Sequence, residues 1–117
     1  MNHHKQGRKF GRVKNQREAL VRSLARSLIV NGKIETTEAK AKELRPFIEK
    51  LITKSNTGTL ASYRLILSRL GGDTEVAKKL KEEIAPAYKK RAGGYTRITK
   101  LSVLSHDARK LAVIEFV

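Results

Sequence analysis

Residues 91–98 read Arg-Ala-Gly-Gly-Tyr-Thr-Arg-Ile and separate a helical part of the chain from two strand-like runs that follow. The consecutive glycines Gly93 and Gly94 give the backbone access to positive φ angles and carry no Cβ. Residues 95–100 read Tyr-Thr-Arg-Ile-Thr-Lys, aromatic and β-branched residues interleaved with cations. This pattern is typical of a strand whose exposed face is basic. The stretch fits either a tight bend into a sheet or a backbone contact with a phosphate chain.

Length and composition predict one domain with a modest core and an ionic surface. The chain has 117 residues, of which 39% are hydrophobic and 32% charged. It has no cysteine, and therefore no disulfide and no thiolate metal site. The sequence contains no apolar run of membrane-spanning length and no secretory signal, so we expect a soluble intracellular protein.

The distribution of charge points to a polyanionic partner. The formal net charge is +15, and residues 1–26 hold eight cations against one acid. Residues 27–87 hold eleven cations against eight acids, and residues 88–117 hold seven against two. Cations concentrated at both ends favour nucleic acid, because neutralised phosphates release their counterions. An anionic membrane is the weaker alternative, since the basic ends form no amphipathic helix with exposed bulky apolar residues.

Residues 1–14 have no acid and no helical or strand periodicity. Such a segment buries too little apolar surface to offset its ordering entropy. It fits either a solvated tail or a basic arm that becomes ordered on RNA, with Phe10 stacked on a base, and the charge favours the arm. His3 and His4 have no third ligand at metal-binding spacing, so we expect no metal there.

Periodicity predicts four helices in the middle of the chain. We expect the first to open at Asn15, with Glu18 completing a capping box, and to end at Asn31-Gly32. The second is capped by Thr37 and kinked or broken at Pro46. The other two are predicted between Thr59 and Gly71, with Leu60, Tyr63, Leu67 and Leu70 inward, and from Asp73 or Thr74 to Pro86.

Three strands complete the predicted elements, at residues 33–36, 95–103 and 111–117. The last is mostly apolar, which indicates a central position in the sheet or a strand covered on both faces. Ser105, His106 and Asp107 carry the side chains of a hydrolase triad. Three consecutive residues point in diverging directions, so we interpret them as a polar turn between strands.

Several motifs resemble a known family. They include Gly7-Arg8-Lys9, the run from Lys40 to Arg45, the glycine stretch 93–98 and the closing run from Ile114 to Val117. Together with Arg17, Thr36-Thr37 and Leu51-Ile52-Thr53, they are similar to bacterial ribosomal protein seventeen of the large subunit. The resemblance runs almost from end to end and is weakest across residues 54–84.

The resemblance implies an α/β fold of the α+β type, with about four helices packed on a small mixed three-stranded sheet. It implies a basic arm at 1–14, one globular domain at 15–117, and a structural role on cytoplasmic ribosomes beside neighbouring ribosomal proteins. The chain would bind large-subunit ribosomal RNA near the peptide exit region, with no cofactor, small-molecule substrate or membrane partner. The expected RNA contacts lie in the arm, the first helix and the glycine stretch: His3, His4, Lys5, Arg8, Lys9, Phe10, Arg12, Lys14, Arg17, Arg22, Arg26, Lys89, Lys90, Arg91, Gly93, Gly94, Tyr95, Arg97 and Lys100.

Two other classes share part of this pattern. A DNA-compacting protein would be as basic, but would usually need a dimer interface, and the sequence has no surplus apolar helix face. An RNA-modifying enzyme would need a cofactor loop or a cluster of catalytic carboxylates, whereas the acids here are scattered. We therefore favour a structural RNA-binding protein.

Overall fold

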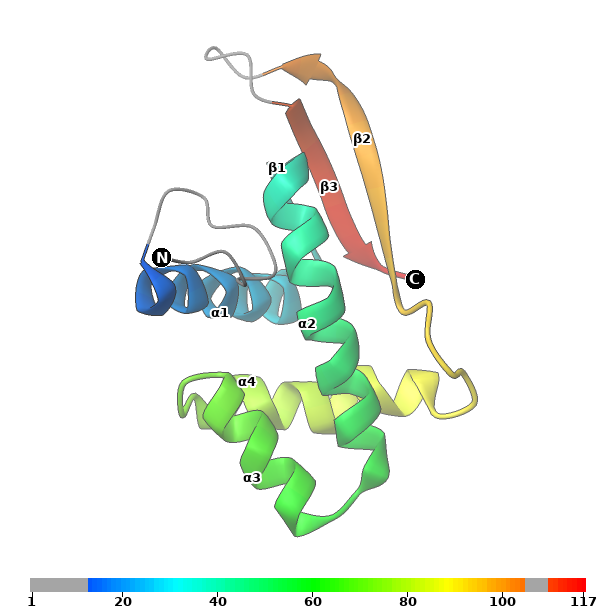
Figure 1. Cartoon of the computed structure of the whole chain (residues 1–117). Helices are drawn as coiled ribbons and strands as arrows, with labels where there is room; N and C mark the ends of the chain where they lie inside the picture. Colours follow the sequence, from blue (N-terminus) through cyan, green and yellow to red (C-terminus); the bar gives the residue numbers. More distant parts are fainter. Residues whose placement is uncertain (1–12, 105–109) are drawn as a thin grey trace.

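The computed structural model describes residues 13–104 and 110–117. One helix and one strand come first, then a run of helices, and a pair of strands ends the chain (Figure 1). In chain order they are α1 (Lys14–Asn31), β1 (Lys33–Thr37), α2 (Glu38–Thr57), α3 (Leu60–Arg69), α4 (Thr74–Lys79), the π-helical turn η1 (Leu80–Ile84), the 3-10 turn η2 (Ala85–Tyr88), β2 (Thr96–Leu104) and β3 (Lys110–Phe116).

The three strands form one antiparallel sheet in the order β1-β3-β2. The α+β class is confirmed, but the expectation of a mixed sheet is wrong. β1 and β2 run in the same direction on opposite edges of β3, so they are never neighbours and every pair is antiparallel. The central position expected for the last strand is confirmed, and its Ala112 and Ile114 are completely buried.

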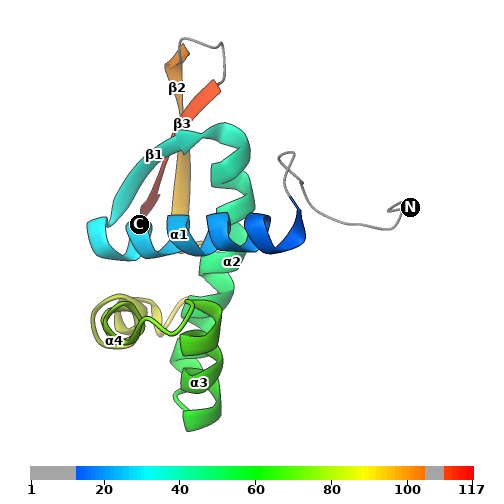
Figure 2. The same ribbon diagram turned by 90° about the vertical axis from the view of Figure 1, so that its left-hand side faces the viewer.

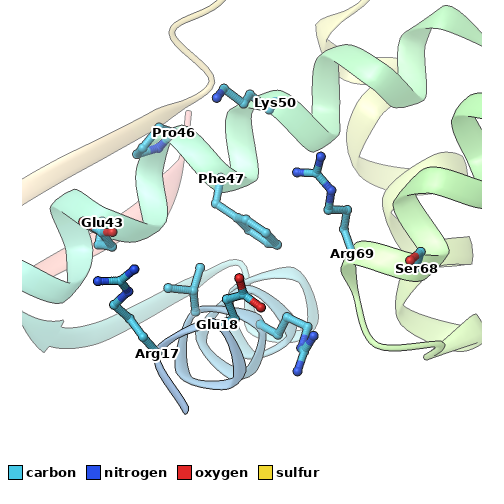
Figure 3. A pocket seen from close by; sticks show the side chains of 10 residues that line it. Arg17, Glu18, Glu43, Pro46, Phe47, Lys50, Ser68 and Arg69 are labelled. Carbon is cyan, nitrogen blue, oxygen red and sulfur yellow. The ribbon is translucent and has the colours of Figure 1, made fainter. Parts of the chain in front are cut away.

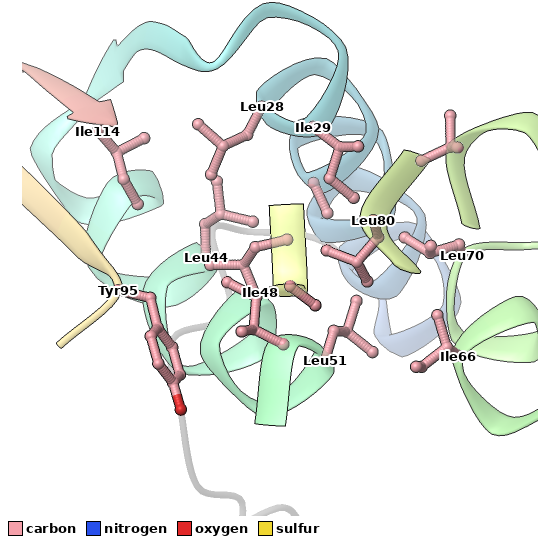
Figure 4. Close-up of a cluster of buried hydrophobic side chains, with 14 of the residues drawn as sticks. Leu28, Ile29, Leu44, Ile48, Leu51, Ile66, Leu70, Leu80, Tyr95 and Ile114 are labelled. Carbon is pink, nitrogen blue, oxygen red and sulfur yellow. The ribbon is translucent and has the colours of Figure 1, made fainter. Parts of the chain in front are cut away.

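Helix α2 is the axis of the molecule. Its first part lies beside the sheet and its last part reaches α3 and α4 in Figure 1, and α1 crosses it in the view of Figure 2. The apolar side chains of α1, α2, α3, η1 and β3 meet in one core, which includes Leu28, Leu44, Ile48, Leu80 and Ile114 (Figure 4). This single cluster holds the helices in fixed positions around α2.

The start of α1 differs from the prediction. The helix begins at Lys14 after Val13, whose carbonyl accepts the N–H of Arg17 at 3.0 Å. Asn15 lies inside the helix, and its Oδ1 accepts from the N–H of Gln16, so it forms no capping box with Glu18. The predicted end is confirmed, because Gly32 caps the helix with φ of 80°.

Helix α2 is capped as predicted, and its Pro46 does not interrupt it. The Thr37 hydroxyl accepts the N–H of Lys40 at 3.3 Å. The helix then runs from Glu38 to Thr57 through Pro46, so the predicted break is wrong. Pro46 lies on the exposed side, where water can reach the backbone carbonyl that loses its helical partner.

The last two predicted helices are correct in position but differ in detail. Leu60 of α3 is 63% exposed rather than inward, because it lies at the first turn, away from Ile66 and Leu70 in the core. Asp73 caps α4, accepting from the N–H of Val76. The chain stays helical past Pro86 by changing to π and then 3-10 geometry, which accommodates a residue with no N–H.

Candidate nucleic-acid interface

The glycine stretch forms a turn held by its own side chains. Gly93 has φ of 146° and Gly94 has φ of 68°, conformations that other residues rarely adopt. Arg91 donates from Nη1 to the carbonyl of Gly94 at 2.9 Å, and its guanidinium lies 5.0 Å from the centre of the Tyr88 ring. A Cβ at either glycine would meet open space, so glycine is needed there for the backbone conformation.

Tyr95 belongs to the core rather than to the surface. It is 2% exposed, and its ring packs on Tyr88 with centroids 5.1 Å apart. The Tyr95 hydroxyl donates to the carbonyl of Arg91 and lies 3.3 Å from the hydroxyl of Thr53. Burial raises the pKa of the neighbouring Tyr88. The Tyr95 ring is therefore in no position to stack on a base.

Helix α2 fixes the start of β2 through Glu49. One oxygen of this carboxylate accepts both the N–H of Thr96, at 3.2 Å, and its hydroxyl, at 2.8 Å. Arg45 lies 3.6 Å from the same oxygen and donates to the carbonyl of Thr96. Since Thr96 is only 3% exposed, Glu49 satisfies polar groups that water barely reaches.

The exposed cations of β2 are matched by carboxylates. Arg97 donates from Nε and Nη2 to Glu115, its cross-strand neighbour, and these bonds lower the pKa of that carboxyl. Lys100 lies 3.4 Å from Glu38, which also pairs with Lys42 at 2.9 Å. The Lys42 hydrogen bond is the main cause of the lowered pKa of Glu38. The predicted basic strand face is thus partly neutralised within the protein.

A groove of about 530 Å³ lies where α1, α2 and α3 meet (Figure 3). Four cations, two carboxylates and an aromatic ring line it, and together with the other lining residues they come from all three helices. Its residues are Arg17, Glu18, Val21, Arg22, Glu43, Pro46, Phe47, Lys50, Ser68 and Arg69. We call this hollow the three-helix groove.

A second hollow of about 400 Å³ connects this groove to the glycine turn. It is lined by α2 and α3 residues together with Ala92, Gly93 and Tyr95. Pro46, Lys50 and Arg69 line both hollows, and Lys54 adds a further cation. We call the surface from Arg17 and Arg22 through Lys50, Lys54 and Arg69 to the glycine turn the basic band.

The structure brings together part of the predicted site. Arg17 and Arg22 line the three-helix groove, and Gly93 lines the second hollow, so the first helix and the glycine turn do belong to one surface. Lys14, Lys89, Lys90 and Arg91 are exposed, and Arg26 is half-buried on α1. The predicted arm contacts lie outside the described residues: His3, His4, Lys5, Arg8, Lys9, Phe10 and Arg12.

Lys50, Lys54 and Arg69 were missed from the sequence. They lie in residues 27–87, where the charges nearly cancel, and the RNA contacts expected from the sequence include no residue of this segment. Only their position on two helices packed side by side aligns them with Arg17 and Arg22. Helical periodicity places residues on one face of a helix but says nothing about which faces meet.

The described residues contain neither a metal-binding cluster nor a membrane-spanning helix. No group of three or more His, Cys, Asp or Glu side chains there could hold a metal ion. None of the helices in these ranges is long and apolar enough to cross a bilayer. The turn predicted at Ser105, His106 and Asp107 lies outside the described residues.

Comparisons with known proteins identify the family. The model of the family described as "Ribosomal protein L17" matches residues 20–117 of this chain. The chain is 51% identical to "Large ribosomal subunit protein bL17" of Nautilia profundicola over 97% of each chain. It is 52% identical to the protein of that name from Gemmatimonas aurantiaca, over 100% of this chain and 98% of the relative. The corresponding Sulfurihydrogenibium protein is 53% identical over 100% and 97%. The chain, with its basic band on a helical face beside an antiparallel sheet, therefore belongs to the ribosomal protein L17 family.

Proposed function

We propose that this chain is a structural component of the large ribosomal subunit and binds large-subunit ribosomal RNA through its basic band and its N-terminal arm. The family supports a structural role rather than an enzymatic one, on ribosomes in the bacterial cytoplasm and beside other ribosomal proteins. The RNA contacts and their location near the peptide exit region are the finer part of the proposal. The exit region rests on the resemblance of the sequence motifs alone.

The observation that carries RNA binding is the continuity of the basic band. Its cations come from α1, α2 and α3, and the two hollows share Lys50 and Arg69. Cations aligned over a continuous surface can follow a phosphate backbone, whereas the same charges scattered over the protein could not. The arm, with Arg8, Lys9 and Arg12, precedes α1 directly and would extend this surface.

The remaining predicted contacts differ in how readily they could reach RNA. Lys14, Lys89 and Lys90 are exposed; along the chain, Lys14 precedes Arg17 of the band, and Lys89 and Lys90 precede the glycine turn. For Arg97 and Lys100, a phosphate would have to compete with Glu115 and Glu38. Tyr95 would act only through the turn it supports, because its ring is buried.

Co-sedimentation tests the ribosomal role. Tagged protein expressed in bacteria is expected to travel with the large subunit in a sucrose gradient at low salt and to remain there in moderate salt. Sedimentation with the nucleoid, or with no ribosomal particle, would overturn the proposal. A chain compacting DNA would be released by DNase and not by RNase.

The exit-region location is tested by directed cleavage of the RNA. The chain has no cysteine, so a single cysteine can carry a radical-generating probe. A probe at Ala92→Cys, beside the second hollow, is expected to cut large-subunit RNA around the exit region. A probe at Leu60→Cys, exposed and outside both hollows, should cut less. Cuts clustered elsewhere in the RNA would contradict the location.

A further inference from the structure

The three-helix groove contains more than cations, and its other residues indicate what it holds. We propose that it receives a single unpaired guanine nucleotide of the bound RNA, with the base on Phe47, the phosphate on the surrounding cations and the base edge on a carboxylate. This inference rests on the proposed RNA-binding function and specifies its ligand.

Phe47 supplies a stacking surface. Its ring extends from α2 into the groove between α1 and the end of α3 (Figure 3). The ring is partly buried and packs against the core, so its orientation is fixed before any ligand arrives. Unpaired RNA bases stack on such aromatic rings, whereas a paired base remains in its own helix.

Three cations from three helices surround the ring. Arg22, Lys50 and Arg69 all line the groove, and within the described residues no carboxylate lies within 4.0 Å of them, since the ion pairs there involve other cations. Arg22 extends toward the loop after α3, where a Cβ on Gly71 would lie 3.7 Å from its Cδ. These cations can therefore take a phosphate without breaking an existing ion pair.

Glu18 and Glu43 explain the choice of base. A groove for phosphate alone would gain nothing from two carboxylates, which repel an anion. Neither carboxylate is among the ion pairs of the described residues, so both keep oxygens that can accept a hydrogen bond from a ligand. The Watson–Crick edge of guanine presents two adjacent donors, N1–H and N2–H, that one carboxylate can accept together. Adenine, cytosine and uracil present one donor group each on that edge.

The size of the groove agrees with one nucleotide. Its volume of about 530 Å³ falls within the range of small-ligand sites, roughly 300–1,000 Å³. In a base pair the Watson–Crick edges of both bases are hydrogen-bonded to each other, so the carboxylates could not accept from their donors. The groove therefore favours a bulge, a loop or another unpaired position.

Short RNA hairpins of equal length test the proposal. One contains a single unpaired guanine, three contain unpaired adenine, cytosine or uracil, and one is fully paired. At fixed salt we expect the guanine bulge to bind about tenfold more tightly than the paired hairpin. The other bulges should lie between them, because they stack without the second hydrogen bond.

Variants connect that preference to the groove. Phe47→Leu keeps an apolar side chain for the core but removes the stacking plane, so it should remove the advantage of every bulge. Glu18→Gln and Glu43→Gln should leave the fold unchanged, because Glu18 is exposed and Glu43 is only half-buried. At least one of them should lose the guanine preference and keep the stacking advantage. Glu75→Gln, exposed on α4 and outside the groove, is the matched control and should change nothing.

The outcomes separate this inference from the proposed function. Equal binding of all five hairpins, with normal salt dependence, would overturn the guanine site and leave RNA binding intact. Failure to bind any RNA would overturn both. Guanosine monophosphate that competes as well as the bulged hairpin would assign the groove to a free nucleotide and overturn the RNA source. Capture of a purified ribosomal protein, abolished by Phe47→Leu, without any bulge preference would assign it to protein instead.

Discussion

Arg69 in the three-helix groove and Arg97 on β2 carry the same charge in different settings. Arg97 makes two hydrogen bonds to Glu115, whereas no carboxylate of the described residues lies within 4.0 Å of Arg69. Arg69 comes from the segment of nearly balanced charge, and Arg97 comes from a strongly basic end. The charge of a segment therefore does not show which cations can bind phosphate, because pairing depends on what the fold places opposite each one.

The largest expected effect comes from removing three cations from the three-helix groove and, in a separate variant, three from the sheet. Replacing Arg22, Lys50 and Arg69 together with Gln should weaken binding to a large-subunit RNA fragment about a hundredfold near 0.1 M salt. The log–log salt slope should fall by roughly 2–3, because three phosphate contacts are lost. Binding titrations over a range of salt measure both quantities.

The matched triple replaces Lys33, Arg97 and Lys100 of the sheet with Gln. It should cost less than about tenfold, because Glu115 and Glu38 already offset these cations. Lys78, Lys79 and Lys81 form a second control, since Lys79 donates to the carbonyl of Val30 and Lys81 lies over the Tyr63 ring. Circular dichroism confirms that each variant is folded. Equal losses in all three sets would show that only total charge matters.

Glu49 tests how far an internal carboxylate contributes to the stability of the sheet region. Glu49→Ala leaves the N–H and hydroxyl of buried Thr96 without their acceptor, so the free energy of unfolding should fall by about 2 kcal/mol. The melting temperature should fall by roughly 10 °C. Glu49→Gln keeps one acceptor oxygen and should recover part of the loss. Thermal melts that leave both variants at the wild-type midpoint would mean that water replaces the carboxylate.

The glycine turn links the basic band to the sheet. A side chain added at Gly94 would strain the backbone without contacting a neighbouring atom. Gly94→Val should lower the free energy of unfolding by about 1–2 kcal/mol, because φ is 68° and a β-branched residue is disfavoured there. Gly94→Asn should cost much less, since Asn tolerates this region. Chemical denaturation measures both. Similar losses for Val and Asn would indicate a steric cause instead of a conformational one.

The smallest expected effect is on pH dependence. Arg97 lowers the pKa of Glu115, so the pair stabilises the folded state above the ordinary glutamate pKa of about 4.3 and this contribution is lost as pH falls through the lowered value. Arg97→Gln should raise the pKa of Glu115 toward that ordinary value, which NMR titration of the carboxyl carbon would show. The stability difference between variant and wild type should disappear in strong acid. A difference that persists there would point to lost packing.

Local chemistry explains which elements were predictable. Thr37 and Asp73 cap helices through hydroxyl and carboxylate acceptors three residues before their donors, so short-range sequence sufficed. The expected capping box at Asn15 failed because Val13 begins the helix with its carbonyl alone. Pro46 was expected to kink or break α2; the helix is not broken there, and Leu44, Ile48 and Leu51 on either side of Pro46 are buried in the core.

The sequence by itself determined the class of the protein: its helices, its three strands, its family and its excess of cations. These follow from periodicity, capping residues and composition, which act over a few residues along the chain. Tertiary structure alone decided which cations are available. Glu115 faces Arg97 only because β2 and β3 pair in one register, and Lys50 joins Arg22 and Arg69 only because three helices meet. Coulombic pairing depends on distance in space, which separation along the sequence does not give.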